Sequence, residues 1–265
     1  MKIKLNLARL KEVRSFSHAG RVVDSTKICE RMKGVYVDVK RGWFVATNDE
    51  AVAVRKNILR CEGDDVMHSQ VDGFVLTKDV MAQLAKQKLM KKDVEVEIER
   101  AANGCVKLVF NGMFETVVPG KYGYVNWEAV VESAKKGAFD VDLAGIIKAG
   151  DEGARNYRTL KEKGLRDKTD WDAWKERKAL IQDNPFPIMF AKNKVLLKEP
   201  HHGETIQEWT LEKDTDMKNV GLSVEYANKA YSFAGSDAAI SFNVLECFVF
   251  KSLDNNKVVV LAPMK

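Results

Sequence analysis

The sequence predicts an α+β protein that contains two tandem copies of one folding unit. Apolar and polar residues alternate with a period of two along much of the 265-residue chain, as in half-buried antiparallel strands. A few stretches with helical spacing interrupt the alternation, and they occur in the same order in both halves. This shared order indicates a duplication, although two similar α+β folds could imitate it without common descent.

In the first half, the spacing of apolar residues predicts a helix near 7–17 and a second helix at 78–88. The predicted strands are 35–39, 43–47, 51–55, 94–99, 106–110 and 114–118. The second half repeats this order, with a helix that begins near Leu143 and another at about 224–233. Its predicted strands are 188–191, 195–198, 206–211, 239–243, 248–251 and 258–262.

Three pairs of segments, one member in each half, have similar residues and so support the duplication. The pairs are LNLARLKEV from Leu5 with VDLAGIIKA from Val141, LTKDVMAQLA from Leu76 with LSVEYANKAY from Leu222, and VVPGK from Val117 with LAPMK from Leu261. In the second pair, Thr77 and Ser223 stand between a strand and a helix, where an N-cap hydroxyl is favoured. We therefore expect both side chains to cap the helices that follow them.

The boundary between the two copies is predicted within 134–140, where a polar, glycine-containing stretch separates two apolar patterns. This gives one domain over 1–136 and another over 137–265. The highly charged segment at about 153–184 carries Trp171 and Trp174 and interrupts the repeat. Two interpretations stay open for it: a solvated charged helix with two half-buried tryptophans, or a contact for DNA or a protein partner.

The composition favours a protein that works inside the cell. No run approaches the roughly 18 apolar residues that a membrane helix needs, and the N-terminus lacks the apolar core of a signal peptide. The net charge of +5, with a pI of about 8.8, is consistent with one positive surface for nucleic acid. The four cysteines are far apart and form no CxxC pair, so neither a zinc ribbon nor a disulfide framework is predicted.

The motifs that support catalysis do not occur in this sequence. It contains neither GxxxxGK[ST] nor GxGxxG, and no Ser-His-Asp arrangement can be argued from its histidines. His201 and His202 are adjacent, but no third metal ligand lies near them in the sequence. We expect a protein that is not an enzyme, with no catalytic residues, no metal and no cofactor.

Several segments resemble the bacterial DNA polymerase III beta sliding clamp. The stretch GWFVATNDEAVAV at 42–54 resembles the VATDGHRLAV signature of the middle domain of that clamp. GFVLTKDVMAQLAK at 73–86 resembles the second helix of that domain with its entry strand, and the stretch 106–131 is similar to the closing strands and turn. KVVVLAPMK at 257–265 resembles the terminal strand and tail. The chain thus resembles the middle and last clamp domains, without the first.

The resemblance implies the DNA clamp fold, in which antiparallel sheets lie outside and two helices per domain line the inner face of a ring. Such a ring encircles duplex DNA without reading its sequence and tethers a replicative DNA polymerase as a processivity factor. At 100° per residue, each predicted helix turns an apolar stripe inward and leaves at least one cation on its free face. The residues implied to contact DNA phosphates are Lys11, Arg14, Lys86, Lys148 and Lys229.

The resemblance also implies a pocket for the short hydrophobic motifs of a polymerase and a clamp loader. The residues carried over are Thr47, Asn48, Ala51, Val52, Val260, Leu261, Ala262, Pro263 and Met264. The sequence departs from the family pattern here, because Asp49-Glu50-Ala51 replaces Gly-His-Arg and Ala262 replaces the first methionine of the tail. We therefore expect the preference for partner motifs to differ.

A clamp ring contains six domains, so a two-domain chain would need three copies. We predict a homotrimer closed by edge strands, of a phage or mobile-element type, acting in the cytoplasm of a bacterium or an infected host. Two alternatives stay open. One is a clamp-like protein that sequesters clamp-binding partners without encircling DNA, and the other is a DNA-binding module that forms no ring.

Overall fold

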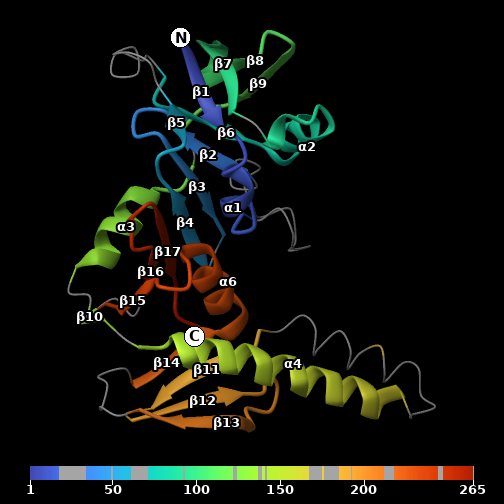
Figure 1. Ribbon diagram of the computed structural model, residues 1–265, viewed down its shortest axis with the longest axis vertical. Helices are drawn as coiled ribbons and strands as arrows, with labels where there is room; N and C mark the ends of the chain where they lie inside the picture. The colour runs from blue at the N-terminus through green and yellow to red at the C-terminus, as the bar shows by residue number, and fades with distance from the viewer. Residues whose placement is uncertain are drawn as a thin grey trace. The chain divides into compact units, whose positions relative to one another are not determined.

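The computed structural model describes residues 1–17, 34–48, 50–60, 71–91, 93–121, 124–136, 139–140, 142–166, 175, 185–191, 193–211, 218–243 and 247–264. It comprises two compact units (Figure 1). Unit 1 consists of Met1–Ser133 and Lys251–Val260, and unit 2 consists of Ala134–Phe250 and Leu261–Lys265. Trp171 and Trp174, which the sequence analysis singled out, lie outside the described residues.

Within the described residues, unit 1 contains two antiparallel sheets and three helices, the last of which extends two residues into unit 2. Its first sheet has the strand order β5-β1-β7-β8-β9, and its second has β17-β4-β3-β2-β6. The strands are β1 (Lys2–Asn6), β2 (Val35–Asp38), β3 (Trp43–Thr47), β4 (Ala51–Arg55), β5 (Leu59–Arg60), β6 (Gly73–Leu76), β7 (Asp93–Arg100), β8 (Cys105–Phe110), β9 (Phe114–Pro119) and β17 (Lys257–Leu261). The helices are α1 (Leu10–Arg14), α2 (Lys78–Lys86) and α3 (Trp127–Lys135), with short 3-10 turns η3 (Leu89–Lys91) and η4 (Ala102–Gly104).

Unit 2 repeats this plan. Its four-stranded sheet has the order β13-β12-β11-β14, and a second group of strands has the order β10-β15-β16. The strands are β10 (Phe139–Asp140), β11 (Pro187–Ala191), β12 (Lys194–Lys198), β13 (Thr205–Thr210), β14 (Lys218–Ser223), β15 (Ala239–Phe242) and β16 (Phe248–Lys251). The helices are α4 (Ala144–Arg166) and α6 (Val224–Ala234). Helix α4 lies across the four-stranded sheet and packs against α6.

The two halves of the chain correspond strand by strand. The order β4-β3-β2-β6 matches β13-β12-β11-β14, and β1-β7-β8 matches β10-β15-β16. A pair of isolated bridges repeats as well, because Phe74 pairs with Gly120 in unit 1 and Gly221 pairs with Met264 in unit 2. The predicted α+β class and the duplication of its elements are therefore confirmed.

Alternating residues build the strands as the sequence predicts. In β7, Val94, Val96 and Ile98 are buried, whereas the glutamates between them face solvent or are half-buried. Lys2 of β1 forms ion pairs with Glu95 and Glu97 at 3.4 and 2.8 Å on that outer face. Both pairs are exposed, so solvent screening leaves them a minor contribution to stability. The apolar face supplies most of the stability of this sheet.

Hydroxyl caps begin the second helix of each half, as predicted. Thr77 Oγ1 accepts a hydrogen bond from Val80 N at 3.4 Å, and Ser223 Oγ accepts one from Tyr226 N at 3.3 Å. Each cap satisfies a backbone N–H that the first turn leaves without an intrahelical partner.

Removing the cap of α6 is expected to cost about 1 kcal/mol of unfolding free energy, because Ser223→Ala leaves a backbone N–H of a buried helix start unsatisfied. Urea denaturation of the variant measures this cost. Ser223→Thr is the matched control and should retain most of the stability, because it keeps a hydroxyl. An unchanged midpoint for Ser223→Ala would show that the cap does not stabilise α6.

Helix α3 differs from the expectation. The resemblance assigned 106–131 to closing strands and a turn, yet residues 127–135 are helical. Trp127, Val131 and Ala134 are buried at spacings of four and three, which places them on one helix face. Trp127 lies against Trp43, with ring centroids 5.6 Å apart.

The segment before α3 is also fixed to unit 1. Tyr124 stacks on Tyr36 with ring centroids 5.2 Å apart, and its hydroxyl donates to Val45 O at 3.1 Å. Burial raises the pKa of both phenols, and for Tyr36 the nearby Asp38 raises it further. Both side chains are therefore neutral across the physiological range. Among the described residues, no helix combines the length and apolarity needed to cross a membrane.

Candidate nucleic-acid contacts and peptide pocket

Helix α1 presents Lys11 as predicted, although it is shorter than the expected 7–17. Leu7, Leu10 and Val13 are fully buried, while Lys11 is exposed and Arg14 is half-buried. The stripe of apolar residues thus fixes which side of α1 meets the core, and Lys11 is left on the opposite side.

A partly buried charge cluster holds α1 in place. Glu12 Oε2 lies 3.2 Å from Arg55 Nε of β4 and 3.2 Å from Lys257 Nζ of β17, all within unit 1. The Arg55 side chain is only 10% exposed, whereas that of Glu12 is 34% exposed. A guanidinium at that depth requires a carboxylate partner, so Glu12 couples the position of α1 to that of β4.

Helix α2 also follows the prediction. Val80, Met81 and Leu84 are buried, and Gln83 and Lys86 are exposed. Lys86 lies in the last turn, where a cation interacts favourably with the helix dipole. Unit 1 therefore contains Lys11, Arg14 and Lys86 of the predicted phosphate contacts.

In unit 2, Lys148 lies on the exposed side of α4. Leu143 and Ile147 are buried, while Ile146 is half-buried rather than buried as expected. Lys148 Nζ lies 5.3 Å from the ring of Tyr231 on α6, a cation–π distance. Lys148 therefore lies against the neighbouring helix while its side chain stays exposed.

Helix α6 is turned slightly from the predicted orientation. Ala227, Ala230, Tyr231 and Ala234 form the buried stripe, so Tyr226 lies at its edge and is half-buried rather than buried. Lys229 is half-buried, with Nζ 5.6 Å from the ring of Tyr226. The small alanines allow a close approach to the core, which explains why they, rather than Tyr226, occupy the centre of the stripe.

Polar contacts fasten α4 to α6, and so bring Lys148 and Lys229 onto adjoining helices. Asn228 Nδ2 donates to Asp151 Oδ2 at 2.9 Å, and Arg158 Nη2 lies 2.5 Å from Glu225 Oε1. Glu225 Oε2 also accepts from Phe186 N at 3.0 Å. Because these contacts join α4, α6 and the residue before β11, the two helices are held as one surface of unit 2.

The first part of the predicted peptide pocket is a tight turn in unit 1. Thr47 Oγ1 donates to Ala51 O at 3.0 Å. Asn48 Oδ1 accepts from Glu50 N and Ala51 N at 3.0 and 2.7 Å, as an Asx turn does. Thr47, Ala51 and Val52 are buried. The polar side chains of Thr47 and Asn48 therefore make hydrogen bonds within the turn itself.

Strand β17 lies beside β4 in the strand order, and Val260 is a buried residue of unit 1. Lys56 N donates to Asn256 O at 2.8 Å at the start of this pairing, which shows that the two strands are antiparallel. Asp254 stabilises the preceding turn. Hydrogen bonds from the Ser252 hydroxyl, then from the Asn256 backbone and side chain, hold the pKa of Asp254 well below its ordinary range.

The remaining pocket residues belong to unit 2. Leu261 is buried, Ala262 is exposed, and Pro263 and Met264 are half-buried. Met264 N donates to Gly221 O at 2.8 Å, and a Cβ on Gly221 would lie 3.2 Å from Met264 Cβ. A glycine at 221 thus permits the close approach of the tail to β14.

The adjacent histidines do not assemble a metal site. His201 and His202 occupy a turn in which both backbone N–H groups donate to Glu199 Oε2, at 2.9 and 2.5 Å. Within the described ranges, no group of three or more His, Cys, Asp or Glu side chains could hold a metal ion. Glu199 is buried and caps the turn, which accounts for its position.

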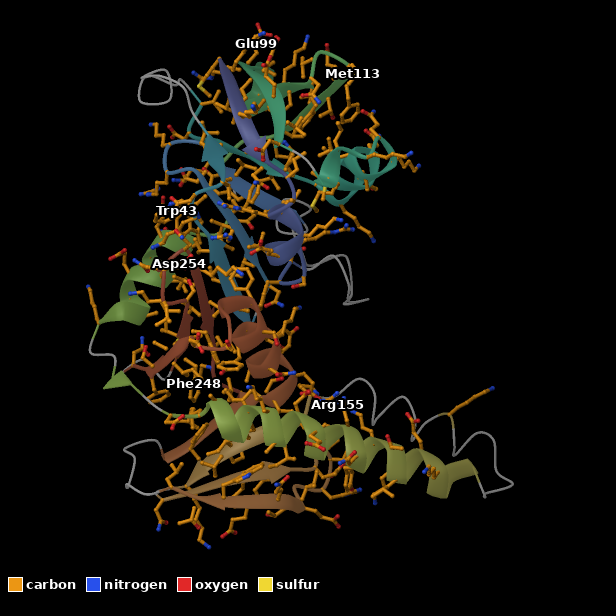
Figure 2. The ribbon with its side chains drawn as sticks, viewed as in Figure 1. Trp43, Glu99, Met113, Arg155, Phe248 and Asp254 are labelled. Carbon is orange, nitrogen blue, oxygen red and sulfur yellow. The ribbon has the colours of Figure 1, made fainter. Side chains whose placement is uncertain are left out.

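The cations on the far half of α4 were not among the predicted contact residues, although the charged segment 153–184 was left open as a contact for DNA or a protein partner. The residues are Arg155, Arg158, Lys161 and Lys163. Arg155, labelled in Figure 2, lies on the same helix as Lys148. The helix that begins near Leu143 continues without a break to 166. The sequence prediction treated 153–184 as a separate segment and so did not recognise this continuity.

Neither a protein-family model nor a curated protein sequence matches the chain. Solved structures are similar over 100% of its length: the Helicobacter pylori beta clamp bound to a DNA ligase peptide (TM-score 0.58, 11% identity), a Caulobacter crescentus beta sliding clamp (0.59, 13%) and DNA polymerase III subunit beta from Borrelia burgdorferi (0.57, 14%). The chain spans 65%, 66% and 63% of those proteins. It therefore has the DNA sliding clamp fold, as predicted, and a shorter length than these structures.

Proposed function

We propose, from the sliding clamp fold of this chain, that it is a DNA sliding clamp: a non-enzymatic processivity factor that encircles duplex DNA and tethers a replicative polymerase. The observation that carries the proposal is the duplicated unit of two helices and two antiparallel sheets, which aligns along its whole length with beta clamps. Its place of action is the cytoplasm of a bacterium or a phage-infected host.

The helix faces support contact with DNA that ignores sequence. Lys11 and Lys86 in unit 1 and Lys148 in unit 2 are exposed on the sides of their helices opposite the core, while Arg14 and Lys229 are half-buried. Flexible cations on rigid helices can exchange phosphate partners without fixing a register on the duplex. This is what a ring that must slide requires.

We assign the closure of the ring to the free edges of two sheets. Within unit 1, β17 of the second repeat lies beside β4 of the first. Their counterparts, β9 of the first repeat and β13 of the second, each end a strand order and so offer backbone groups that no other described strand pairs. A head-to-tail pairing of β9 with β13 of another copy would repeat the β17–β4 pairing and use both edges. Three copies would supply the six units of the ring.

The peptide pocket remains part of the proposal. Its residues would be Thr47, Asn48, Ala51, Val52, Val260, Leu261, Ala262, Pro263 and Met264. The Helicobacter pylori beta clamp that resembles this chain binds a DNA ligase peptide, which supports a peptide partner as a class. A hydrophobic motif from a polymerase or a clamp loader is the partner we propose.

Two measurements test the function. Light scattering is expected to give the mass of a trimer, and the chain is expected to be retained on circular DNA but to slide off after linearisation, once a loader has placed it. A module that merely binds DNA would stay on both forms. A stable monomer that still captures clamp-binding peptides would overturn encirclement and would favour the sequestering alternative.

A further inference from the structure

Two hairpins in the first sheet of unit 1 contain the same dipeptide. Asn-Gly occurs twice in the sequence, at Asn103-Gly104 between β7 and β8 and at Asn111-Gly112 between β8 and β9 (Figure 1). Asn103 and Gly104 have φ of 57° and 71°, and Asn111 and Gly112 have φ of 49° and 67°. Positive φ at both central residues is typical of a type I′ turn, which this dipeptide favours. All four residues are exposed, and a Cβ on either glycine would meet no atom within 4 Å.

The two asparagines differ in what holds their side chains. Asn111 Oδ1 accepts a hydrogen bond from Glu95 N at 3.0 Å, and Asn111 N donates to Glu95 O at 2.8 Å. The Asn111 side chain is therefore tied to the backbone of β7. By contrast, the Asn103 side chain makes no hydrogen bond with any residue that the structure describes. The chain thus contains the same turn twice, once with a tethered asparagine and once with a free one.

An asparagine that precedes glycine can lose its amide without an enzyme, because glycine leaves its own backbone nitrogen accessible to the neighbouring side chain. At the first turn, Gly104 N would form a bond to Asn103 Cγ while the bond from Cγ to Nδ2 breaks. The side-chain nitrogen leaves as ammonia and takes the proton from the Gly104 amide. Water then opens the resulting succinimide at one of its two carbonyls, which gives aspartate or isoaspartate. Water is the only other reactant.

This attack requires a rotation of the peptide between the two turn residues. Asn103 has ψ of 30°, which directs Gly104 N away from the Asn103 side chain. A rotation to about −120° brings the two groups together and converts the type I′ turn into type II′, which hairpins also accept. The Asn103 side chain can then adopt the rotamer that the attack needs, because nothing restrains it. The Asn111 side chain must first release Glu95 N, so its reaction carries an additional cost.

We propose that Asn103 is a site of spontaneous deamidation in the folded chain and that the hydrogen bond from Glu95 protects Asn111. The inference goes beyond the proposed function and does not depend on it. The modification would also reach the neighbouring strand. Gly120 N donates to Gly104 O at 3.1 Å, and a Cβ on Gly120 would lie 2.4 Å from that oxygen, so the turn fits closely against the end of β9. Isoaspartate adds a carbon to the backbone at Asn103 and would displace this carbonyl.

The test follows both turns in the same sample. The full-length chain is incubated in neutral buffer, and deamidation is measured over time by mass spectrometry of its tryptic peptides. Cleavage after Lys107 separates the two turns into the peptides 101–107 and 108–121. The same two peptides, incubated free in solution, give the rate of each dipeptide without folded structure. After division by these rates, we expect deamidation to be several-fold faster at Asn103 than at Asn111.

Asn103→Gln is the matched control, because it keeps an amide but lengthens the side chain beyond the succinimide ring. The peptide 101–107 of this variant should stay unmodified, which assigns the mass change to Asn103. Equal normalised rates at the two turns, or a faster rate at Asn111, would overturn the inference. An unmodified Asn103 in the folded chain, over a time in which the free peptides convert, would overturn it too. These outcomes do not bear on DNA binding or on oligomeric state, so the proposed function is tested separately.

Discussion

Replacing Glu12 with glutamine is expected to lower the free energy of unfolding by about 2–3 kcal/mol, because it removes the carboxylate that is paired with a nearly buried guanidinium. Glu12 Oε2 lies 3.2 Å from both Arg55 and Lys257, and the Arg55 side chain is 10% exposed. The loss is smaller than for a fully buried pair since Glu12 itself is partly hydrated. Urea denaturation followed by tryptophan fluorescence measures it.

The matched control is Lys257→Gln. The Lys257 side chain is 28% exposed, and its removal leaves the Glu12–Arg55 pair intact, so we expect a cost below about 1 kcal/mol. A cost for Glu12→Gln no larger than that of Lys257→Gln would show that Arg55 does not depend on Glu12. The same comparison bears on function, because Glu12 fixes the helix that carries Lys11 and Arg14.

Val117→Pro is expected to abolish assembly while leaving the monomer folded. Gly120 N donates to Gly104 O at 3.1 Å, so alternate residues of β9 turn their backbone groups towards β8. By this alternation Val117 N–H points to the open edge, where the side chain is 57% exposed. Proline removes that donor without removing a bond to β8, and edge strands tolerate it. Mass in solution should fall from that of a trimer to that of a monomer.

Two further variants make this prediction specific. Val117→Thr keeps the backbone donor and should assemble normally. Glu208→Pro alters the opposite edge, because Leu211 N donates to Asn193 O at 2.7 Å, which leaves the N–H of Glu208 pointing away from β12. It should also yield monomers. Trimers that persist in both proline variants would contradict the assignment of β9 and β13, although not the fold.

The sequence predicts most strands of this protein because their side chains alternate locally. The strands expected at 43–47, 51–55 and 248–251 have those bounds in the structure. Strand β1 was not recognised, although Lys2–Asn6 alternates, because its pairing with β7 joins residues more than 80 positions apart. Pairing across such a separation is decided by the core and not by the local pattern.

The buried faces of the helices were predictable from the local spacing of apolar residues, whereas the residues at which the helices begin and end were not. The buried residues of α2 follow directly from helical spacing. By contrast, α4 continues through a charged segment that the sequence suggested was separate, since exposed cations neither extend nor interrupt an apolar stripe. Predicting helix α3 would have required knowing that Trp127 packs against Trp43, which is a contact between distant parts of unit 1.

Two glycines determine how closely α4 lies on its sheet, and the consequence is mechanical. A Cβ at Gly153 would stand 2.8 Å from Gln207 Oε1 and 3.0 Å from Leu197 Cδ2, and one at Gly150 would stand 3.0 Å from Val224 Cγ2. A methyl group at either position must tilt the helix or displace its neighbours. Because Lys163 lies about 15 Å further along a rigid rod, a small rotation at Gly153 would become a larger displacement at the far end. Substitution of these glycines could thus re-aim the distal charges without touching any of them.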